Sequence, residues 1–254
     1  MQYALTRESP APPETIASRA VGLVKVYGSG ADAVRALDNV TVEFPARHFT
    51  AIMGPSGSGK STLMPCLAGL DTPTSGTVLL GDVDLGGLSD KKLTLLRRER
   101  VGFVFQAFNL VPMLTAGENL TLPLTLAGTR PDPDWIGAVT GTMGLADRLS
   151  YRPAQLSGGQ QQRVAVARAL ASRPLVIFAD EPTGNLDSTS GGELLGLLRE
   201  VVDEFGHTVV MVTHDPVAAG HADAVVFLAD GRCAGHLDRP TPQRVLDQMK
   251  TMGG

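Results

Sequence analysis

Short apolar stretches alternate with glycine-rich turns and helical patterns along most of this chain. Four stretches have the length and composition of buried strands: 49–53, 101–106, 175–179 and 208–213. Helical patterns follow three of them: Leu63, Leu67 and Leu70 lie at the spacing of one helix face, and further patterns cover 158–172 and 192–204. Because strands and helices alternate, the pattern predicts an α/β fold with a mostly parallel sheet.

Two regions, one before and one after the first of these strands, have a different pattern. Residues 21–44 and 75–85 consist of short strands and turns, in which Val40, Val42 and Phe44 alternate with polar neighbours. Alternation with a period of two is typical of a sheet with one buried face. We therefore expect an antiparallel β layer beside the core.

The middle of the chain is divided by prolines. Residues 89–100 have a helical pattern with Ser89 as a plausible N-cap. Prolines then separate 108–155 into short helical pieces, one of them around 135–145. The composition predicts an inserted helical subdomain over about 108–160.

The length of 254 residues, with 43% hydrophobic and 19% charged residues, is typical of one catalytic unit with subdomains. The proline-rich start predicts a flexible lead-in over 1–19, with ordered structure beginning near Ala20. We expect one folded domain over 20–240 and a short C-terminal tail over 241–254. No internal repeat is visible, which excludes tandem copies of this domain.

Charge and cysteine usage restrict the partners and the compartment. The net charge is −4, and no basic stripe stands out beyond the cluster Arg97–Arg100, so nucleic acid is not expected as a main partner. Cys66 and Cys233 do not form a disulfide framework and fit reduced thiols in the cytosol. No run approaches the roughly 18 apolar residues of a membrane span.

A glycine-rich loop between the first buried strand and its helix carries the strongest chemical signal. It reads Gly54, Pro55, Ser56, Gly57, Ser58, Gly59, Lys60, Ser61 and Thr62. Glycines at these positions let backbone N–H groups turn inward and form an anion nest at a helix N-terminus. Lys60 is expected on the β and γ phosphates of a nucleotide, Ser61 on Mg²⁺, and Thr62 on a phosphate.

Polar side chains follow the other buried strands. Asp180 and Glu181 end one strand, His214 follows the next, and Gln106 ends a third. Because ligands bind at the carboxyl ends of parallel strands, we expect Asp180 on Mg²⁺, Glu181 polarising the attacking water, His214 sensing the γ phosphate, and Gln106 offering an amide oxygen to Mg²⁺ or water. The alternative is a pair of solvated acids and a structural histidine.

A second phosphate-binding tip is predicted at Ser157, Gly158 and Gly159, which open the helical pattern at 158–172. A helix of about 15 residues spans about 22 Å, so its tip is expected too far from the phosphate loop of its own chain. We therefore predict that the tip completes the site of another protomer, and that two chains enclose two ATP molecules head to tail.

With these residues in place, the chain resembles the ATP-binding-cassette ATPases over about 20–240. The resemblance implies a P-loop NTPase core of the RecA-like type, with ATP as substrate and Mg²⁺ as cofactor. It identifies 54–62 as the Walker A loop, Gln106 as the Q-loop glutamine, Asp180 and Glu181 as the Walker B pair, and His214 as the switch histidine. Leu156 to Gln160 match the signature motif, and Asp187 matches the D-loop. The resemblance implies that both motifs act in trans, on the nucleotide of the partner chain.

Tyr27 matches the aromatic residue that stacks on adenine in this family. From its chemistry alone, Tyr27 is equally compatible with the core of the β layer. The sequence of 26–44, 152–174 and 180–188 more specifically resembles the lipoprotein-release, macrolide-export and cell-division branch of bacterial transporter ATPases. Pro65, inside the Walker A helix, and Arg47-His48, in a strand-to-strand turn, depart from the pattern of the family.

The resemblance implies an energising subunit at the inner face of the cell membrane, where ATP closes the dimer, hydrolysis reopens it, and separate permease subunits receive the motion. The surface of 108–113 is a candidate groove for a coupling helix of the permease, although Phe108 and Leu110 are equally compatible with subdomain core. A soluble ATPase acting on DNA or ribosomes and a regulatory ATP-binding module with little turnover are the alternatives.

Overall fold

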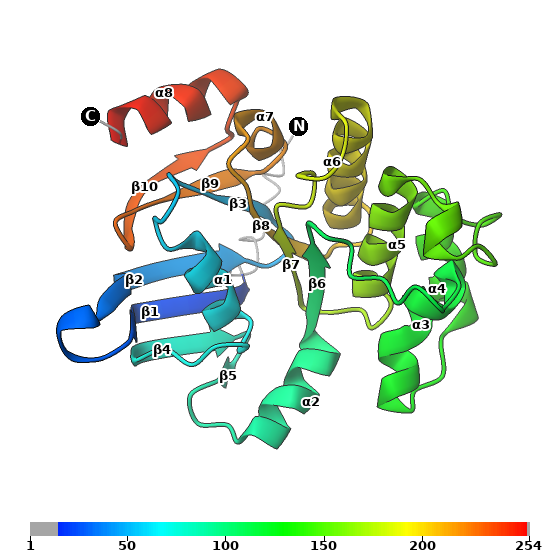
Figure 1. Ribbon diagram of the computed structural model, residues 1–254, viewed down its shortest axis with the longest axis horizontal. Helices are drawn as coiled ribbons and strands as arrows, with labels where there is room; N and C mark the ends of the chain where they lie inside the picture. Colours follow the sequence, from blue (N-terminus) through cyan, green and yellow to red (C-terminus); the bar gives the residue numbers. More distant parts are fainter. Residues whose placement is uncertain (1–14, 253–254) are drawn as a thin grey trace, which may run out of the picture.

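A six-stranded sheet forms the centre of the protein in a computed structural model, which describes residues 15–252 (Figure 1). Its strand order is β10-β9-β3-β8-β7-β6. The strands are β3 (Phe49–Met53), β6 (Val101–Phe105), β7 (Val176–Asp180), β8 (Thr208–Val212), β9 (Ala224–Ala229) and β10 (Arg232–Asp238). All neighbours pair in parallel except β9 and β10. This arrangement confirms the predicted parallel core.

A second, antiparallel sheet lies on one side of this centre, in the order β2-β1-β4-β5. Its strands are β1 (Ile16–Tyr27), β2 (Val34–Pro45), β4 (Ser75–Leu80) and β5 (Val83–Asp84), and a short 3₁₀ turn η1 (Gly30–Asp32) joins the first two. Val40, Val42 and Phe44 are buried between exposed neighbours, as their alternation predicts. This is the expected β layer.

Helix α1 (Lys60–Leu67) packs between the two sheets. Alternate residues of the central strands face it: in β7, for example, Phe178 packs in the cluster that contains Leu63 and Leu67, whereas Ile177 packs in the cluster on the opposite face. Leu70 lies beyond the end of α1 and is 51% exposed, so its assignment to the apolar helix face is wrong. Burial from both sides explains the continuous apolar runs of these strands.

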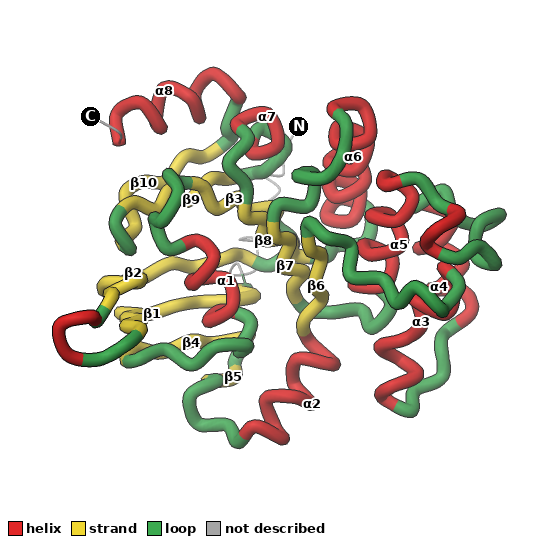
Figure 2. The backbone as a smooth tube through the Cα atoms, viewed as in Figure 1, coloured by secondary structure: helices red, strands yellow, loops and turns green. Residues whose placement is uncertain are grey.

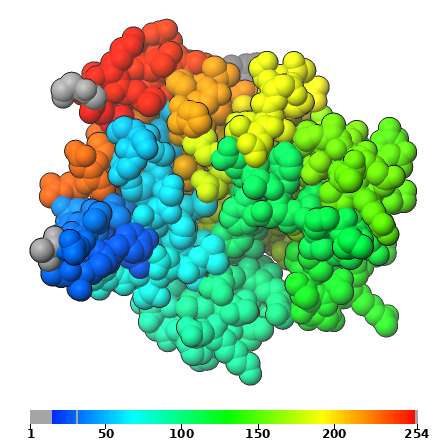
Figure 3. All heavy atoms as spheres, in the orientation of Figure 1, coloured from blue at the N-terminus to red at the C-terminus, as the bar shows by residue number. Residues whose placement is uncertain are grey.

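On the opposite face of the central sheet, α5 (Gly158–Leu170) packs against β6 and α6 (Ser188–Asp203) packs against β8. Helices α3 (Ala116–Ala127) and α4 (Pro133–Thr142) pack against α5, and a 3₁₀ turn η2 (Pro153–Gln155) precedes α5. Helix α2 (Asp90–Arg100) leads into β6, α7 (Pro216–Ala219) follows β8, and α8 (Pro242–Met252) ends the described chain. In Figure 3, residues of α3, α4 and α5 form a green lobe on the side opposite the blue antiparallel strands.

Three boundaries differ from the sequence-based expectation. Strand β1 begins at Ile16, not near Ala20, because Ala17 and Ser18 are fully buried and β1 pairs with the end of β2 from Ile16 onward. Residues 241–254 are not only a tail, since α8 buries Val245 in the core cluster. Helix α6 begins at Ser188 instead of 192, where Asp187 caps it. Figure 2 shows in green the loop that joins β7 to this helix.

Among residues 15–252, no helix combines the length and the apolar composition needed to cross a membrane. Both cysteines are free: Cys66 is buried in α1 and Cys233 is exposed on β10. Burial raises the pKa of the Cys66 thiol to about 11, so this thiol stays protonated at neutral pH.

Pro65 lies inside α1 without ending it, since the helix continues to Leu67. A proline has no N–H to donate to the carbonyl four residues earlier, which is that of Ser61. The Pro65 carbonyl is well used: it accepts from the N–H groups of Leu70 at 2.8 Å and Asp71 at 3.2 Å. The cost of Pro65 is therefore one missing helical hydrogen bond in the helix that follows the phosphate loop.

We predict that Pro65→Ala stabilises the protein. Restoring the N–H of residue 65 removes a penalty of about 3 kcal/mol for proline in a helix interior, and the freer unfolded chain takes back about 1 kcal/mol. The free energy of unfolding, measured by urea titration, should rise by about 2 kcal/mol. An unchanged or lower value would show that the ring of Pro65 contributes more by packing than its missing N–H costs.

Candidate functional site

Residues from three segments meet at the carboxyl edge of the central sheet, around a cavity of about 270 Å³. The cavity is lined by Gly54, Ser56, Gly57, Lys60, Ser61, Asp180, Glu181, Val212 and His214. They follow β3, β7 and β8, which are parallel neighbours, so their carboxyl ends lie side by side. Eight of the nine were predicted as site residues, and Val212 was not.

The backbone of the phosphate loop needs glycine for steric reasons. Gly54 has φ +155°, and a Cβ there would lie 2.0 Å from the Leu228 carbonyl oxygen of β9. Gly59 has φ +101°, and its Cβ would lie 2.6 Å from the Ala36 carbonyl oxygen of β2. The Gly231 N–H donates to the Ser58 carbonyl at 3.1 Å. The loop is thus held against both sheets, with its turn directed toward the cavity.

Lys60 is folded across this loop. Its Nζ donates to the carbonyl oxygens of Gly54 and Pro55, each at 2.8 Å, and lies 3.4 Å from the Ser58 hydroxyl. Burial lowers the pKa of Lys60, and the charges of Glu181 and Asp180 oppose that shift. The ammonium is therefore partly desolvated and held beside two carboxylates.

The two acids differ in environment. Asp180 ends β7, and burial first, with repulsion from Glu181 second, raises the pKa of its carboxyl group, while Lys60 lowers it. Glu181 has the left-handed φ of +45°, and its N–H donates to the Val212 carbonyl at 2.9 Å. This uncommon backbone conformation for a non-glycine residue turns the Glu181 side chain toward the strand that leads to His214.

His214 contacts Glu181 directly. Its Nδ1 lies 2.9 Å from Glu181 Oε1. Because a carboxylate can only accept, the contact requires a proton on Nδ1, so the neutral tautomer leaves Nε2 free to accept. The His214 side chain is 74% exposed and that of Glu181 is 21% exposed. The pair thus reaches from the sheet edge into solvent at the mouth of the cavity.

The donor set fits a magnesium ion that arrives with a phosphate ligand. Ser61 and Asp180 offer the hard oxygen atoms that Mg²⁺ prefers, and both line the same cavity. Within residues 15–252, no three His, Cys, Asp or Glu side chains gather closely enough to hold a metal by themselves. Mg²⁺ commonly binds through one or two protein oxygens together with substrate phosphates, which is what this edge provides.

Gln106 does not line the cavity. Its Nε2 donates to Asn185 Oδ1 at 3.2 Å, and Asn185 Nδ2 donates back to the Gln106 carbonyl at 3.0 Å. The side chain of Gln106 therefore connects the end of β6 with the loop after β7 instead of reaching Asp180. Asn185 lies two residues before the D-loop residue Asp187, and its contact with Gln106 was not predicted.

The tip of α5 also lies outside the cavity. Ser157 caps the helix as predicted: its hydroxyl accepts from the Gln160 N–H at 3.3 Å, and Gln160 Oε1 accepts from the Ser157 N–H at 2.9 Å. A Cβ on Gly159 would lie 3.3 Å from Ser190 of α6. Asp187 caps α6 in turn, so its carboxylate is occupied within its own chain.

Tyr27 is not a residue of the β-layer core, because it is 44% exposed at the end of β1. Its hydroxyl donates to Asp71 Oδ2 at 2.9 Å, and Lys25 Nζ lies 4.9 Å from the centroid of its ring. Burial and the bond to Asp71 raise the pKa of Tyr27, whereas a bond with the Thr62 hydroxyl lowers it. The ring is thus fixed beside the phosphate-loop helix and remains accessible.

Comparison with known proteins identifies this arrangement. The sequence profile of the ABC transporter family matches residues 37–184. The chain belongs to the ABC transporter family. MJ0796 of Methanocaldococcus jannaschii, an uncharacterized ABC transporter ATP-binding protein, is 44% identical over 222 residues, which cover 82% of this chain and 92% of that protein.

One further relative and one solved structure extend the comparison. The macrolide export ATP-binding/permease protein MacB of Brucella melitensis is 44% identical over 238 residues, which cover 91% of this chain. The ABC chain spans only 36% of the length of that relative. A dimeric structure of a post-hydrolysis state of the cassette MJ0796, bound to ADP and Pi, has a TM-score of 0.78 at 40% identity and covers 87% of this chain and 98% of that one. The predicted family and fold class are confirmed.

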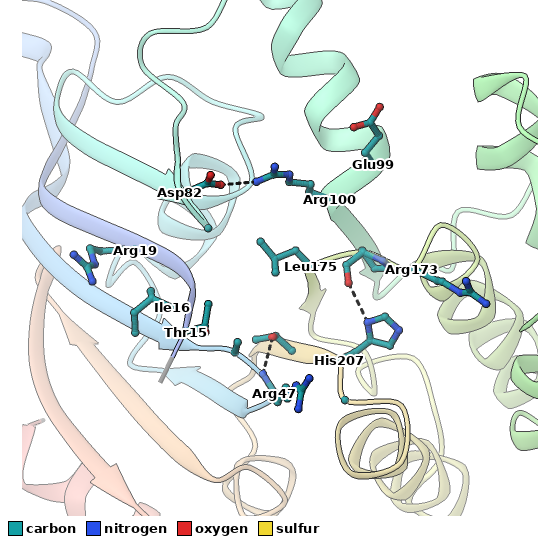
Figure 4. A pocket seen from close by; sticks show the side chains of 15 residues that line it. Thr15, Ile16, Arg19, Arg47, Asp82, Glu99, Arg100, Arg173, Leu175 and His207 are labelled. Carbon is teal, nitrogen blue, oxygen red and sulfur yellow. Dashed lines mark hydrogen bonds and ion pairs between the residues drawn. The ribbon is translucent and has the colours of Figure 1, made fainter. Parts of the chain in front are cut away.

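A larger cavity of about 830 Å³ lies at the opposite, amino edge of the sheet of this ABC cassette (Figure 4). It contains none of the predicted site residues. Its charged groups are largely neutralised: Arg100 pairs with Asp82 at 3.0 Å, and Arg19 pairs with Glu43 at 2.8 Å. His207 Nδ1 contacts the Pro174 carbonyl at 3.0 Å, and burial lowers the pKa of His207. The carboxyl-edge cavity is therefore the better functional site, although it is smaller.

Sequence reasoning missed Gln162 of α5. Its side chain is fully buried, and its Nε2 donates to the carbonyls of Phe105 at 3.1 Å and Pro182 at 2.6 Å. Its place in the run LSGGQQQR gave no signal, because a glutamine inside a helix more often faces solvent. Only the folded structure shows that it touches two catalytic loops.

We predict that Asp180→Asn raises the melting temperature in the absence of divalent cation and nucleotide. The folded-state pKa of Asp180 is raised, so its charge costs stability above that pKa, and the cost vanishes below the unfolded value of about 3.9, where both states are protonated. The gain should be present at neutral pH and shrink as the pH falls through the folded pKa.

The matched control for this experiment is Asp82→Asn. The pKa of Asp82 is lowered by its bond to Arg100, so the same chemical change should bring no gain, or a small loss, at neutral pH. Thermal unfolding monitored by circular dichroism over a pH series compares both variants with the wild type. Equal melting temperatures for Asp180→Asn and the wild type at neutral pH would contradict the prediction that the charge of Asp180 destabilises the fold.

Proposed function

We propose that this chain is the ATP-binding and ATP-hydrolysing cassette of an ABC transporter. The observation that carries the proposal is the carboxyl-edge cavity, where one loop supplies an anion nest, an ammonium group and a hydroxyl group, and neighbouring strands supply two carboxylates and an imidazole. This combination suits a triphosphate with its divalent ion, since each charge of the ligand meets a complementary group.

The residues divide the work of hydrolysis. The N–H groups of 54–62 and Lys60 bind the phosphates, and Lys60 can exchange its contacts with loop carbonyls for phosphate oxygens at little cost in desolvation. Glu181 orients and polarises the attacking water, and the contact with His214 fixes its carboxylate. When bound, Mg²⁺ would be held by Ser61 and Asp180 and would neutralise phosphate charge.

The position of the second predicted phosphate-binding tip supports a homodimer. The cavity of one chain is lined by residues that follow β3, β7 and β8, while the capped tip at Ser157–Gly159 lies outside it, with backbone N–H groups at a helix N-terminus. Placed head to tail, two chains would bring each tip to the nucleotide of the partner. The dimeric cassette structure at 40% identity supports this arrangement.

A groove beside the helical lobe suits a permease segment. It has a volume of about 450 Å³ and combines Phe103 and Phe105, stacked at 5.6 Å between centroids, with the guanidinium groups of Arg97, Arg98 and Arg168. Of the segment 108–113 predicted for this role, Leu110 packs against the core, whereas Met113 is 73% exposed. A partner helix with apolar and acidic residues would fit.

The transporter relatives favour export over the alternative of a soluble ATPase on DNA or ribosomes. The macrolide-export relative joins an ATP-binding part to a permease in its printed name, and this chain matches 36% of its length. We therefore propose that the cassette acts at the inner face of the cell membrane and drives an export or mechanotransmission cycle through a permease, as a member of the lipoprotein-release, macrolide-export and cell-division branch.

We predict that Glu181→Gln abolishes turnover but preserves ATP binding. Loss of the carboxylate that polarises water should lower kcat by about 10²- to 10⁴-fold, while the phosphate loop is unchanged. With Mg²⁺ and ATP, the variant should accumulate as a dimer in analytical ultracentrifugation, because hydrolysis no longer reopens it. A control without ATP should sediment as a monomer.

Three outcomes would count against the proposed function. A kcat of Glu181→Gln equal to that of the wild type would remove Glu181 from its role, and a strictly monomeric sedimentation profile with ATP would remove the homodimer. Wild-type protein without Mg²⁺-dependent phosphate release would contradict ATP hydrolysis itself.

We predict that Tyr27→Ala weakens ATP binding without weakening the binding of tripolyphosphate, which has no base. Base–aromatic stacking contributes about 1–3 kcal/mol, so the Kd of ATP should rise roughly 5- to 100-fold. Isothermal titration calorimetry with both ligands makes the comparison, and Tyr151→Ala, which removes a tyrosine outside the cavity, is the control. An equal loss of affinity for both ligands would mean that Tyr27 supports the loop instead of the base.

A further inference from the structure

Gln162 joins three segments that carry functional groups. It lies on α5, five residues after the helix cap Ser157, and its side chain has no exposed surface. One nitrogen, Nε2, donates both of its hydrogens: to the Phe105 carbonyl at 3.1 Å and to the Pro182 carbonyl at 2.6 Å. Two carbonyls from separate loops are thus held by a single amide group.

These carbonyls belong to residues next to the catalytic groups. Phe105 pairs with Asp180 in the register of β6 and β7, and Pro182 directly follows Glu181. A displacement of α5 along its axis would therefore pull on the turn that sets the backbone of Glu181, whose φ of +45° makes it sensitive to such a change.

The amide of Gln162 is not explained by packing alone. Its Oε1 is buried and accepts no hydrogen bond from the described residues. An unpaired buried acceptor costs stability, and an apolar side chain of similar size would avoid that cost. The two donated bonds are what distinguishes the glutamine from such a residue.

A second connection closes the network on the other side of α5. Gln106, which follows Phe105, exchanges two hydrogen bonds with Asn185, and two residues later Asp187 caps α6 through the Ser190 N–H at 3.0 Å. Ser190 in turn lies against Gly159 at the tip of α5. α5 is therefore linked to the end of β6 and to the turn after β7 in two ways. One link is the Gln162 side chain, and the other runs from Gln106 through Asn185 and α6 to the tip of α5.

We propose that Gln162 is a positioning residue that couples the two nucleotide sites of the dimer. The inference rests on the proposed function: if the tip of α5 contacts the ATP of the partner while Glu181 serves the ATP of its own chain, Gln162 connects the first site to the second. Occupation of one site then sets the position of the catalytic turn at the other, which makes hydrolysis cooperative.

The test measures steady-state ATPase activity against ATP concentration for wild type and Gln162→Met, a near-isosteric change that removes both donated bonds. We expect kcat to fall by about tenfold, as for the loss of one to two hydrogen bonds that act in the transition state, and the Hill coefficient to fall toward 1. The Kd of ADP should stay unchanged, because no residue of the phosphate loop is altered.

A double-mutant cycle with Ser157→Ala separates coupling from simple damage. If Gln162 transmits the position of the tip, Ser157→Ala should reduce kcat less in the Gln162→Met background than in the wild type. Gln162→Asn keeps the amide but shortens the arm so that it cannot reach both carbonyls. It should give a smaller effect in the same direction, and it replaces Gln162→Met if that variant does not fold.

Asn119→Ala is the matched control. Asn119 is another fully buried amide, but it holds the loop at 111–115 instead of the catalytic turns, so its loss should lower the melting temperature and leave the Hill coefficient unchanged. A wild-type Hill coefficient with additive effects in the cycle would overturn the inference. Absence of ATPase activity in the wild type would instead overturn the proposed function.

Discussion

The phosphate loop of this cassette is held between two sheets, and this constraint places the loop beside the ends of β7 and β8, where the other groups of the site lie. The backbone at Gly54 passes so close to β9 that no side chain fits, and at Gly59 a Cβ would lie too close to a backbone oxygen of β2. The loop therefore has one available path, which directs its turn toward the carboxyl edge of the sheet. A rigid anion nest at a fixed place lets side chains from separate strands converge on one ligand.

The charged groups of the site compensate one another only in part, so the site favours a charged ligand. Lys60 is desolvated enough that its pKa falls, and Asp180 is buried beside Glu181 so that its pKa rises. Each group thus carries a charge that the protein alone compensates incompletely. A phosphate chain with its divalent cation would satisfy both signs at once, so stability given up in the free cassette is regained on binding.

The proposed division of the site between two chains gives the hydrogen-bond network around α5 its importance. In the head-to-tail dimer that we propose, the glycine tip and Glu181 of one chain would serve different nucleotides, and one buried side chain and a reciprocal amide pair join them. Packing at Gly159 against Ser190 leaves little room for independent movement of α5 and α6. Helices α5 and α6 and the loops after β6 and β7 are thus expected to move together.

The sequence by itself determined the family, the parallel core and most of the cavity, because glycine spacing and buried apolar runs have few structural solutions. It also determined the helix cap at Ser157, which depends on a neighbour three residues away. It could not place Gln106 against Asn185, 79 residues apart, nor reveal Gln162 between two carbonyls, nor show that β1 begins at Ile16. Only the tertiary structure decided these, since a hydrogen bond between distant segments depends on how the sheets and helices pack and leaves no local pattern in the chain.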